Sequence, residues 1–209
     1  MLVHDIVPPK GGPWCLVLHG LGDSKDGWKS AVPLIAPPGA GWIFVQAPNA
    51  YGPGWSWFDI DWATHSPDPV GVARSRTALL ELLDHLETTR GIHAQDLRLV
   101  GFSQGCLMVL ELALTVDRRF AGVAAISGWI HALDRFPAGL APAARSQRIL
   151  MTHGRWDDVL PIAATRPMAA ELKAHGLTLD WREYDKDHGL DPEREVEDLR
   201  RFLTNPGAK

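Results

Sequence analysis

Cysteine, tyrosine and long apolar runs are scarce in this sequence of 209 residues. It has only two cysteines, Cys15 and Cys106, and no C-x-x-C pair that would indicate a metal or redox site. Each cysteine lies in an apolar run, where a thiol packs like a small hydrophobic side chain. This distribution argues against a scaffold held together by disulfides and favours a reducing, cytoplasmic location.

The sequence also lacks a membrane-spanning run, a secretory signal and a basic surface. Its most apolar run, FAGVAAISGWI, is far shorter than the roughly 20 residues that a bilayer requires. The opening MLVHDIVPPKGGPW has neither the basic start nor the apolar stretch of a signal peptide. The formal net charge of −4 at pH 7 provides no positive field for a phosphate backbone. We therefore expect no nucleic-acid partner and no stable membrane insertion.

Six short apolar runs, bounded by glycine, proline or aspartate, have the length of β-strands. They are WCLVLHG (14–20), WIFVQAP (42–48), LRLVGF (97–102), AGVAAISG (121–128), RILMTHG (148–154) and LTLDWREY (177–184). Four of these runs are apolar on both faces, which is typical of strands in a mostly parallel sheet that helices cover on both sides.

A period near 3.6 residues predicts four helices between and after these strands. They cover residues 70–88, 104–116, 161–175 and the stretch after Asp191-Pro192, with Gly91 and Gly176 as the expected stop signals. Strands that alternate with helices predict right-handed β-α-β crossovers and a single doubly wound α/β domain over residues 1–209. In such a sheet, ligands bind at the carboxyl ends of the strands.

One of these strand ends carries a serine between two glycines. Residues Gly101-Phe102-Ser103-Gln104-Gly105 match the pattern G-x-S-x-G between a predicted strand and a predicted helix. The glycines suit a turn so sharp that it strains the serine and lifts its hydroxyl out. We therefore interpret Ser103 as a candidate nucleophile. Because the pattern also arises by chance in glycine-rich loops, this interpretation depends on partners elsewhere in the chain.

A serine hydroxyl becomes reactive when a histidine accepts its proton and a carboxylate orients that histidine. His188 follows the last predicted strand and precedes the terminal helix, so we expect it at the carboxyl edge of the sheet. Several other histidines lie in predicted helices or in turns without such a position. We interpret these as surface or capping residues: His4, His65, His85, His93, His131 and His175.

The loop after the fifth predicted strand offers two adjacent carboxylates, Asp157 and Asp158. One of them should face the imidazole of His188, and the other could cap the helix that starts near Pro161. Their position in the chain does not decide between them. Either choice gives the order serine, aspartate, histidine, which is the order found in α/β-hydrolases.

The tetrahedral intermediate of acyl transfer needs two hydrogen-bond donors for its oxyanion. The backbone N–H of Gln104 is one candidate, because it directly follows the nucleophile. The loop LHGLGD after the first predicted strand offers the second, the backbone N–H of Leu21, and we expect His19 to support this loop. A phosphate-binding loop is the alternative for this stretch, but the Lys-Ser/Thr ending of a P-loop is absent.

Aromatic residues gather in the segment YGPGWSWFDIDWATHSPDPVG (51–71), which is too irregular to predict a strand or a helix. These side chains could form the wall of an apolar acyl pocket. Alternatively, Trp55, Trp57 and Trp62 only cover one end of the hydrophobic core. Two further tryptophans lie on loops that follow strands. The candidate substrate-binding residues are Trp57, Phe58, Trp129 and Trp156.

Together these motifs resemble the phospholipase/carboxylesterase family of α/β-hydrolases, which includes bacterial carboxylesterases and acyl-protein thioesterases. The similarity spans nearly the whole chain and rests on LHGLGD, WFDI, GFSQG, ISG, HGRWDDVLP and DHGL, in this order. It implies an α/β-hydrolase fold and a serine hydrolase of small-molecule esters or acyl thioesters that needs no metal and no cofactor. The short chain leaves little room for a separate cap domain. The implied roles are Ser103 as nucleophile, Asp157 rather than Asp158 as acid, His188 as base, and Leu21 and Gln104 as oxyanion donors.

Two positions depart from the pattern of the family. Cys106 stands where the family usually has glycine, and Asp158 stands where proline usually follows the acid. Neither change removes a catalytic group, although Asp158 adds a charge that could exchange roles with its neighbour. The remaining alternatives are an acyl-protein or acyl thioesterase, a lysophospholipase, and a binding protein that has this fold without catalysis.

Overall fold

A sheet of seven strands lies at the centre of the computed structural model, which describes residues 1–61, 63–64 and 66–205. Its strands are β1 (His4–Val7), β2 (Trp14–Leu18), β3 (Gly41–Val45), β8 (Leu97–Phe102), β9 (Gly122–Ile126), β10 (Ile149–Gly154) and β11 (Leu179–Tyr184). Their order is β1-β3-β2-β8-β9-β10-β11, and only the edge pair β1 and β3 is antiparallel. The six predicted strands and the mostly parallel sheet are confirmed, whereas β1 was not predicted.

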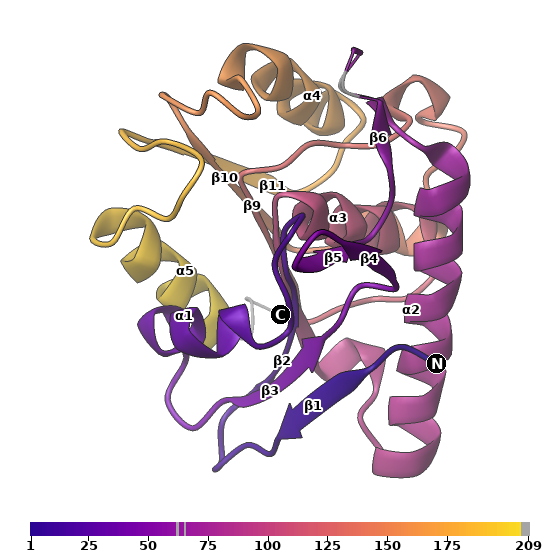
Figure 1. The fold of residues 1–209 in the computed structure, drawn as a ribbon, viewed down its shortest axis with the longest axis vertical. Coiled ribbons are helices and arrows are strands. Elements are labelled where there is room, and N and C mark those ends of the chain that lie inside the picture. The colour runs from indigo at the N-terminus through magenta and orange to yellow at the C-terminus, as the bar shows by residue number, and fades with distance from the viewer. Residues whose placement is uncertain (62, 65, 206–209) are drawn as a thin grey trace.

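Helices flank both faces of this sheet (Figure 1). In the part of the chain that the structure describes, the α-helices are α1 (Gly27–Ile35), α2 (Pro69–Arg90), α3 (Gln104–Thr115), α4 (Ile162–Ala174) and α5 (Arg194–Thr204). The helices α1 and α5 lie against each other on one face, and α2 packs on α3 on the other. Four of these helices were predicted. The helix α1 was missed because its nine residues include Gly27 and Pro33, which obscure the helical period.

The side chains of the central strands alternate between the two layers of helices. In β2, Leu16 and Leu18 belong to the hydrophobic cluster beneath α2 and α3, whereas Cys15 and Val17 belong to the cluster beneath α1 and α5. This alternation explains why the strand reads as an uninterrupted apolar run. The sequence pattern therefore reflects a sheet that is covered on both sides.

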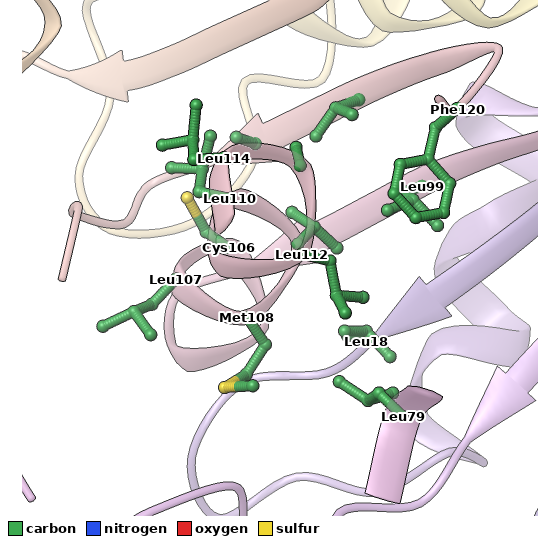
Figure 2. Packing of buried hydrophobic residues seen from close by; sticks show 14 of the residues in the cluster. Leu18, Leu79, Leu99, Cys106, Leu107, Met108, Leu110, Leu112, Leu114 and Phe120 are labelled. Atoms are coloured by element: carbon green, nitrogen blue, oxygen red, sulfur yellow. The ribbon is translucent and has the colours of Figure 1, made fainter. Parts of the chain in front are cut away.

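The helix α3 lies deep in the core. Its residues from Gln104 to Leu114 are all buried. Figure 2 shows Leu107, Met108 and Leu112 of this helix together with Leu18 of β2 and Phe120, which is fully buried. A helix surrounded in this way has little freedom to shift, because protein interiors are close-packed. Its first turn is therefore a firm base for the residue that precedes it, Ser103.

The expected stop signals of two helices are present. Gly91 follows α2 in the left-handed conformation, with φ of 63°, and donates its N–H to the carbonyl of Glu87. Gly176 follows α4 with φ of 81°. The terminal helix α5 begins at Arg194, later than expected directly after Asp191-Pro192, and its N-cap is Glu193; Oδ1 of Asp191 accepts the N–H of Arg194 at 2.7 Å.

The segment 51–71 is more regular than predicted. It contains parts of two small hairpins, formed by β4 (Asn49–Tyr51) with β5 (Gly54–Ser56) and by β6 (Ile60–Asp61) with β7 (Ser66–Pro67). The expectation of no strand here was wrong, because strands of two or three residues are too short to show a period in the sequence. The interpretations of Trp62 and His65 fall outside the described residues.

The chain changes direction across the sheet at β2. In the sheet, β2 lies between β3 on one side and β8 on the other. The connections that leave β2 and β8 therefore diverge, and a crevice opens at the carboxyl ends of these strands. Residues 19–23 and Ser103 follow these two strand ends directly.

Candidate active site

Ser103 occupies a strained turn between β8 and α3. Its backbone has φ of 54° and ψ of −114°, and its N–H donates to the carbonyl of Ile126 on β9 at 2.9 Å. The neighbouring glycines are required by close packing. A Cβ on Gly105 would lie 2.1 Å from the carbonyl oxygen of Leu18, and one on Gly101 would lie 2.2 Å from the carbonyl oxygen of Gly105. The G-x-S-x-G pattern therefore reflects the tight approach of β2, β8 and α3.

The structure brings Ser103, His188 and Asp157 together from three separate loops. The Nε2 atom of His188 lies 3.0 Å from Oγ of Ser103, and its Nδ1 atom lies 2.8 Å from Oδ2 of Asp157. Because an ionised carboxylate can only accept, Nδ1 carries the hydrogen, and Nε2 is left to accept the serine proton. The ring of Phe102 packs against the imidazole with centroids 5.1 Å apart. This arrangement matches the geometry of a serine, histidine and aspartate triad.

The carboxylate of Asp157 is fully buried and stays charged. Its Oδ1 atom accepts the backbone N–H groups of Val159 at 3.1 Å and Leu160 at 2.7 Å. Burial raises the pKa of this carboxyl, but the hydrogen bonds from His188 and Leu160 outweigh it, so that the net pKa lies below its usual value. Asp157 can therefore hold the imidazole and stabilise a positive charge on it.

Asp158 points elsewhere. It is exposed, and it makes no hydrogen bond or ion pair with the other residues that the structure describes. It lines a neighbouring groove instead of contacting His188. The alternative role as a helix cap is also not met, because α4 begins without any side-chain cap.

A second histidine, His153, lies close to Asp157 and was missed in the sequence. Its Nε2 atom donates to the carbonyl of Leu160 at 2.8 Å and lies 3.3 Å from Oδ2 of Asp157. The ring is fully buried and stacks on Trp181, and burial lowers its pKa. A signal was available, because His153 stands at the carboxyl end of a predicted strand, four residues before Asp157.

Leu21 and Gln104, the two predicted oxyanion donors, both line the cavity over Ser103. Within the described residues, neither backbone N–H group donates to a protein acceptor. Gln104 is the first residue of α3, where the N–H groups of a helix are free and its dipole favours negative charge. Both positions fit donors to an oxyanion formed at Ser103.

His19 fixes the direction of the Leu21 N–H. Its Nε2 atom accepts the N–H of Ala47 at 3.1 Å, so its Nδ1 atom carries the hydrogen and donates to the carbonyl of Gly20 at 2.7 Å. The carbonyl of Gly20 and the N–H of Leu21 belong to one planar trans peptide and point in opposite directions. Burial lowers the pKa of His19, which favours the neutral ring that this arrangement needs. The predicted support of the loop by His19 thus has a defined geometry.

The side chain of Gln104 holds the aromatic segment in place. Its Oε1 atom accepts the N–H of Trp57 at 2.9 Å, and its Nε2 atom donates to the carbonyl of Phe58 at 2.8 Å. The indole N–H of Trp57 in turn donates to the carbonyl of His19 at 2.9 Å. Trp57 is therefore a fully buried link between the turn at Ser103 and the loop that begins at His19, and it does not line the cavity.

A cavity of about 220 Å³ lies over Ser103, with His188 and Gln104 in its wall. Its apolar lining consists of Leu21, Ile60, Phe102, Trp129, Val159 and Leu160. A larger groove of about 630 Å³ adjoins it and shares Trp129 and Leu160. Of the four predicted substrate-binding residues, only Trp129 borders the cavity over Ser103. Phe58 borders a smaller cavity beside it, and Trp156 is 69% exposed and lines neither space.

Both cysteines are buried and free. Burial raises the pKa of the Cys15 thiol to about 12 and that of Cys106 even higher, so both thiols stay protonated. Within residues 1–61, 63–64 and 66–205, no three or more His, Cys, Asp or Glu side chains are grouped to hold a metal ion. The described helices also include none with both the length and the hydrophobicity needed to cross a bilayer.

Comparison with known proteins places the chain in a family. The model of the family described as Phospholipase/Carboxylesterase matches residues 10–205, which is most of the chain. The chain belongs to the phospholipase/carboxylesterase family. This finding confirms the resemblance that the sequence motifs indicated.

One relative of this chain is an acyl-protein thioesterase 1 of Schizosaccharomyces pombe, which is 34% identical over 166 residues. The match covers 75% of this chain and 74% of the relative. A probable carboxylesterase of Oryza sativa is 30% identical over 184 residues, covering 81% of this chain and 68% of the relative. Among solved structures, the Bacillus cereus carboxylesterase superposes with a TM-score of 0.83 at 16% identity and covers 97% of this chain and 93% of its own. That structural likeness establishes the fold.

Proposed function

We propose that this protein is a serine hydrolase that cleaves carboxylic esters through an acyl-enzyme on Ser103. The observation that carries the proposal is the pair of hydrogen bonds that connects Oγ of Ser103 to His188 at 3.0 Å and His188 to Asp157 at 2.8 Å. These bonds lie beside a cavity with apolar walls and two free backbone donors. Membership of the phospholipase/carboxylesterase family supports the same chemistry.

In the first half of the reaction, Oγ of Ser103 bonds to the carbonyl carbon of the ester while Nε2 of His188 accepts the hydroxyl proton. The resulting imidazolium is stabilised by the charged carboxylate of Asp157 through Nδ1–H. The carbonyl oxygen becomes an oxyanion and accepts hydrogen bonds from the N–H groups of Leu21 and Gln104. The bond to the leaving alkoxide oxygen then breaks, and that oxygen takes the proton from Nε2.

In the second half, water replaces the alcohol. Nε2 of His188 accepts one proton from the water while its oxygen attacks the carbonyl carbon of the acyl-enzyme. The second tetrahedral intermediate uses the same two backbone donors. Its collapse breaks the bond to Oγ of Ser103, which recovers its proton from His188. The net reaction converts an ester and water to a carboxylic acid and an alcohol.

The lining of the cavity supports a substrate class. The walls that Leu21, Ile60, Trp129 and Leu160 provide are apolar, which suits an uncharged acyl group. The volume of about 220 Å³ suits a short acyl chain, and the adjoining groove of about 630 Å³ can receive further length. We infer a small-molecule ester or acyl thioester as substrate. We also propose a cytoplasmic location, which the buried, free thiols support.

Hydrolysis of an acyl thioester is the second candidate activity. It is supported by the relatives named acyl-protein thioesterase 1, of which the one from Schizosaccharomyces pombe is 34% identical. The same nucleophile, base and oxyanion donors would act on either substrate. Steady-state kcat/KM for O-esters and S-esters with the same acyl chain separates the two activities. A ratio that favours the thioester at every chain length would replace the carboxylesterase by a thioesterase.

Labelling with a fluorophosphonate tests the proposed nucleophile directly. We expect the probe to modify wild-type protein at Ser103 and to leave Ser103→Ala unmodified. Ser30→Ala serves as the matched control, because Ser30 is an exposed serine on α1. Folded wild-type protein that stays unlabelled would contradict the proposal and favour a binding protein without catalysis.

A further inference from the structure

A buried ion pair that the reaction above does not use lies beside the loop that carries His188. Nζ of Lys186 lies 2.7 Å from Oε1 of Glu195, and the two side chains are only 4% and 0% exposed. Burying two charges costs free energy that their attraction often fails to recover, so such a pair is weak evidence of a stabilising role. Lys186 stands two residues before His188 in the chain, which indicates that the pair has a role in the loop that carries this histidine.

The ammonium group of Lys186 connects three parts of the structure. Besides Glu195 on α5, it donates to Oγ of Ser127 at 3.0 Å and to the carbonyl of Gly189 at 2.8 Å. All three of its N–H donors are therefore used. Ser127 is fully buried directly after β9, and Gly189 directly follows His188. The hydrogen bonds of Lys186 thus connect the loop that carries His188 to the end of β9 and to α5.

Glu195 extends this anchorage to the far end of the loop. While its Oε1 atom pairs with Lys186, its Oε2 atom accepts the backbone N–H of Asp191 at 2.8 Å. The ion pair therefore holds the loop at Lys186, Gly189 and Asp191, on both sides of His188. The backbone carbonyl of Lys186 also accepts the N–H of Trp156 at 3.0 Å, which joins the loop to the one that carries Asp157.

We propose that Lys186 and Glu195 form a positioning pair that keeps the imidazole of His188 between Ser103 and Asp157. The inference rests on the proposed role of His188 as general base. The loop has no helix or strand of its own at residues 185–191, so the contacts that the side chains of Lys186 and Glu195 make with its backbone help to define its shape. Displacement of a catalytic group by about 1 Å can lower the rate by roughly a hundredfold.

The double variant Lys186→Met/Glu195→Leu separates positioning from simple stabilisation. Apolar side chains of similar volume can replace a buried ion pair without loss of stability. Because the two substitutions also remove hydrogen bonds to Oγ of Ser127, the carbonyl of Gly189 and the N–H of Asp191, we expect a folded variant whose unfolding midpoint in urea lies at or moderately below that of the wild type. We also expect kcat for p-nitrophenyl butyrate to fall by roughly 10-fold to 100-fold, while KM changes less than about twofold, because substrate contacts are untouched.

Tyr184→Phe is the matched control. Tyr184 is buried and its hydroxyl donates to Oδ2 of Asp198 at 2.7 Å, which is another link between β11 and α5, and it does not contact Lys186 or Glu195 through a hydrogen bond. We expect wild-type kcat from this variant. A folded double variant with wild-type kcat would overturn the proposal.

A milder variant decides the case if the double variant fails to fold. Glu195→Gln keeps the shape of the side chain, but its NH₂ group replaces one of the two accepting oxygens and faces either the ammonium group of Lys186 or the N–H of Asp191, so one of these two contacts is lost. We expect a reduced kcat with an unchanged KM, and wild-type kcat in folded Glu195→Gln would contradict the inference. Fluorophosphonate labelling of wild-type Ser103 keeps the two proposals distinct, because its absence would refute the proposed function itself.

Discussion

The two halves of the candidate active site are held in place in different ways. Ser103, Gln104 and Leu21 follow the adjacent strands β8 and β2, and their positions are set by backbone geometry and by glycines that admit no Cβ. Asp157 and His188 lie on loops after β10 and β11, towards the sheet edge, and hydrogen bonds and charges of side chains hold them. Substitution of the glycines in the first half should therefore mainly reduce stability, whereas loss of the side-chain contacts that hold His188 in the second half should mainly reduce turnover.

The largest effect is expected for Asp157→Asn in the histidine half. An amide can still accept the N–H of Leu160, but it cannot hold His188 with its hydrogen on Nδ1 or stabilise the imidazolium, so kcat should fall by roughly 10⁴-fold. Steady-state hydrolysis of p-nitrophenyl butyrate measures this loss, and the unfolding midpoint reports whether the fold is retained. Asp158→Asn should keep wild-type kcat, and equal losses in both variants would show that the two aspartates share the role.

A substitution in the nucleophile half should act on stability instead. In Gly105→Ala, the new Cβ would lie 2.1 Å from the carbonyl oxygen of Leu18, and this backbone oxygen of β2 cannot move aside. We expect the free energy of unfolding in urea to fall by about 3 kcal/mol. Gly139→Ala is the control, since its Cβ would meet nothing closer than 3.3 Å. A variant as stable as the control would refute the packing argument for this glycine.

The smallest effect concerns the stability of the histidine half in acid. Hydrogen bonds from Arg166 and then Trp181 lower the pKa of Glu183 on β11 to about 2, compared with 4.5 for an unperturbed group. A carboxyl whose pKa is lower in the folded state stabilises the fold above 4.5, and this contribution is lost as the pH falls towards 2.

Glu183→Gln should therefore flatten the decline of stability with falling pH in this range. We expect the wild type to lose about 1 kcal/mol more than the variant, because the partly exposed ion pair is screened by solvent. Urea unfolding at a series of pH values measures the difference. Glu81→Gln, at an exposed position on α2, controls for the loss of a surface charge. Parallel curves for wild type and Glu183→Gln would contradict the assignment.

The elements that the sequence revealed are those with a long or strong local signal. The central strands are apolar on both faces because helices cover both sides of the sheet. Their apolar runs therefore allowed these strands to be predicted from the sequence. The helices α2 and α3 have 22 and 12 residues, which is long enough for a clear period or an apolar run. The missed strand β1 has four residues at the sheet edge, where partial exposure removes the apolar signal.

Within the candidate active site, the sequence was informative about backbone features and much less about side-chain contacts. The turn at Ser103 could be predicted, because its tight geometry requires glycine at positions 101 and 105. The sequence did not decide whether the aromatic residues of 55–58 line a cavity or close the hydrophobic core, because the same residue types occur in both environments. Only the hydrogen bonds of Trp57 to Gln104 and His19 reveal that it belongs to the core.

The sequence by itself predicted six of the seven strands of the central sheet, four of the helices and the strained turn at Ser103, and it placed His188 after the last strand, because these depend on local periodicity, on glycine sterics and on the ends of predicted strands. Tertiary structure decided that Asp157 rather than Asp158 contacts the imidazole, that His153 lies beside that carboxylate, and that Lys186 pairs with Glu195. The physical reason is that such contacts join loops that are distant in the chain. Distances of about 3 Å between these side chains arise only when the strands that carry the loops are aligned in one sheet.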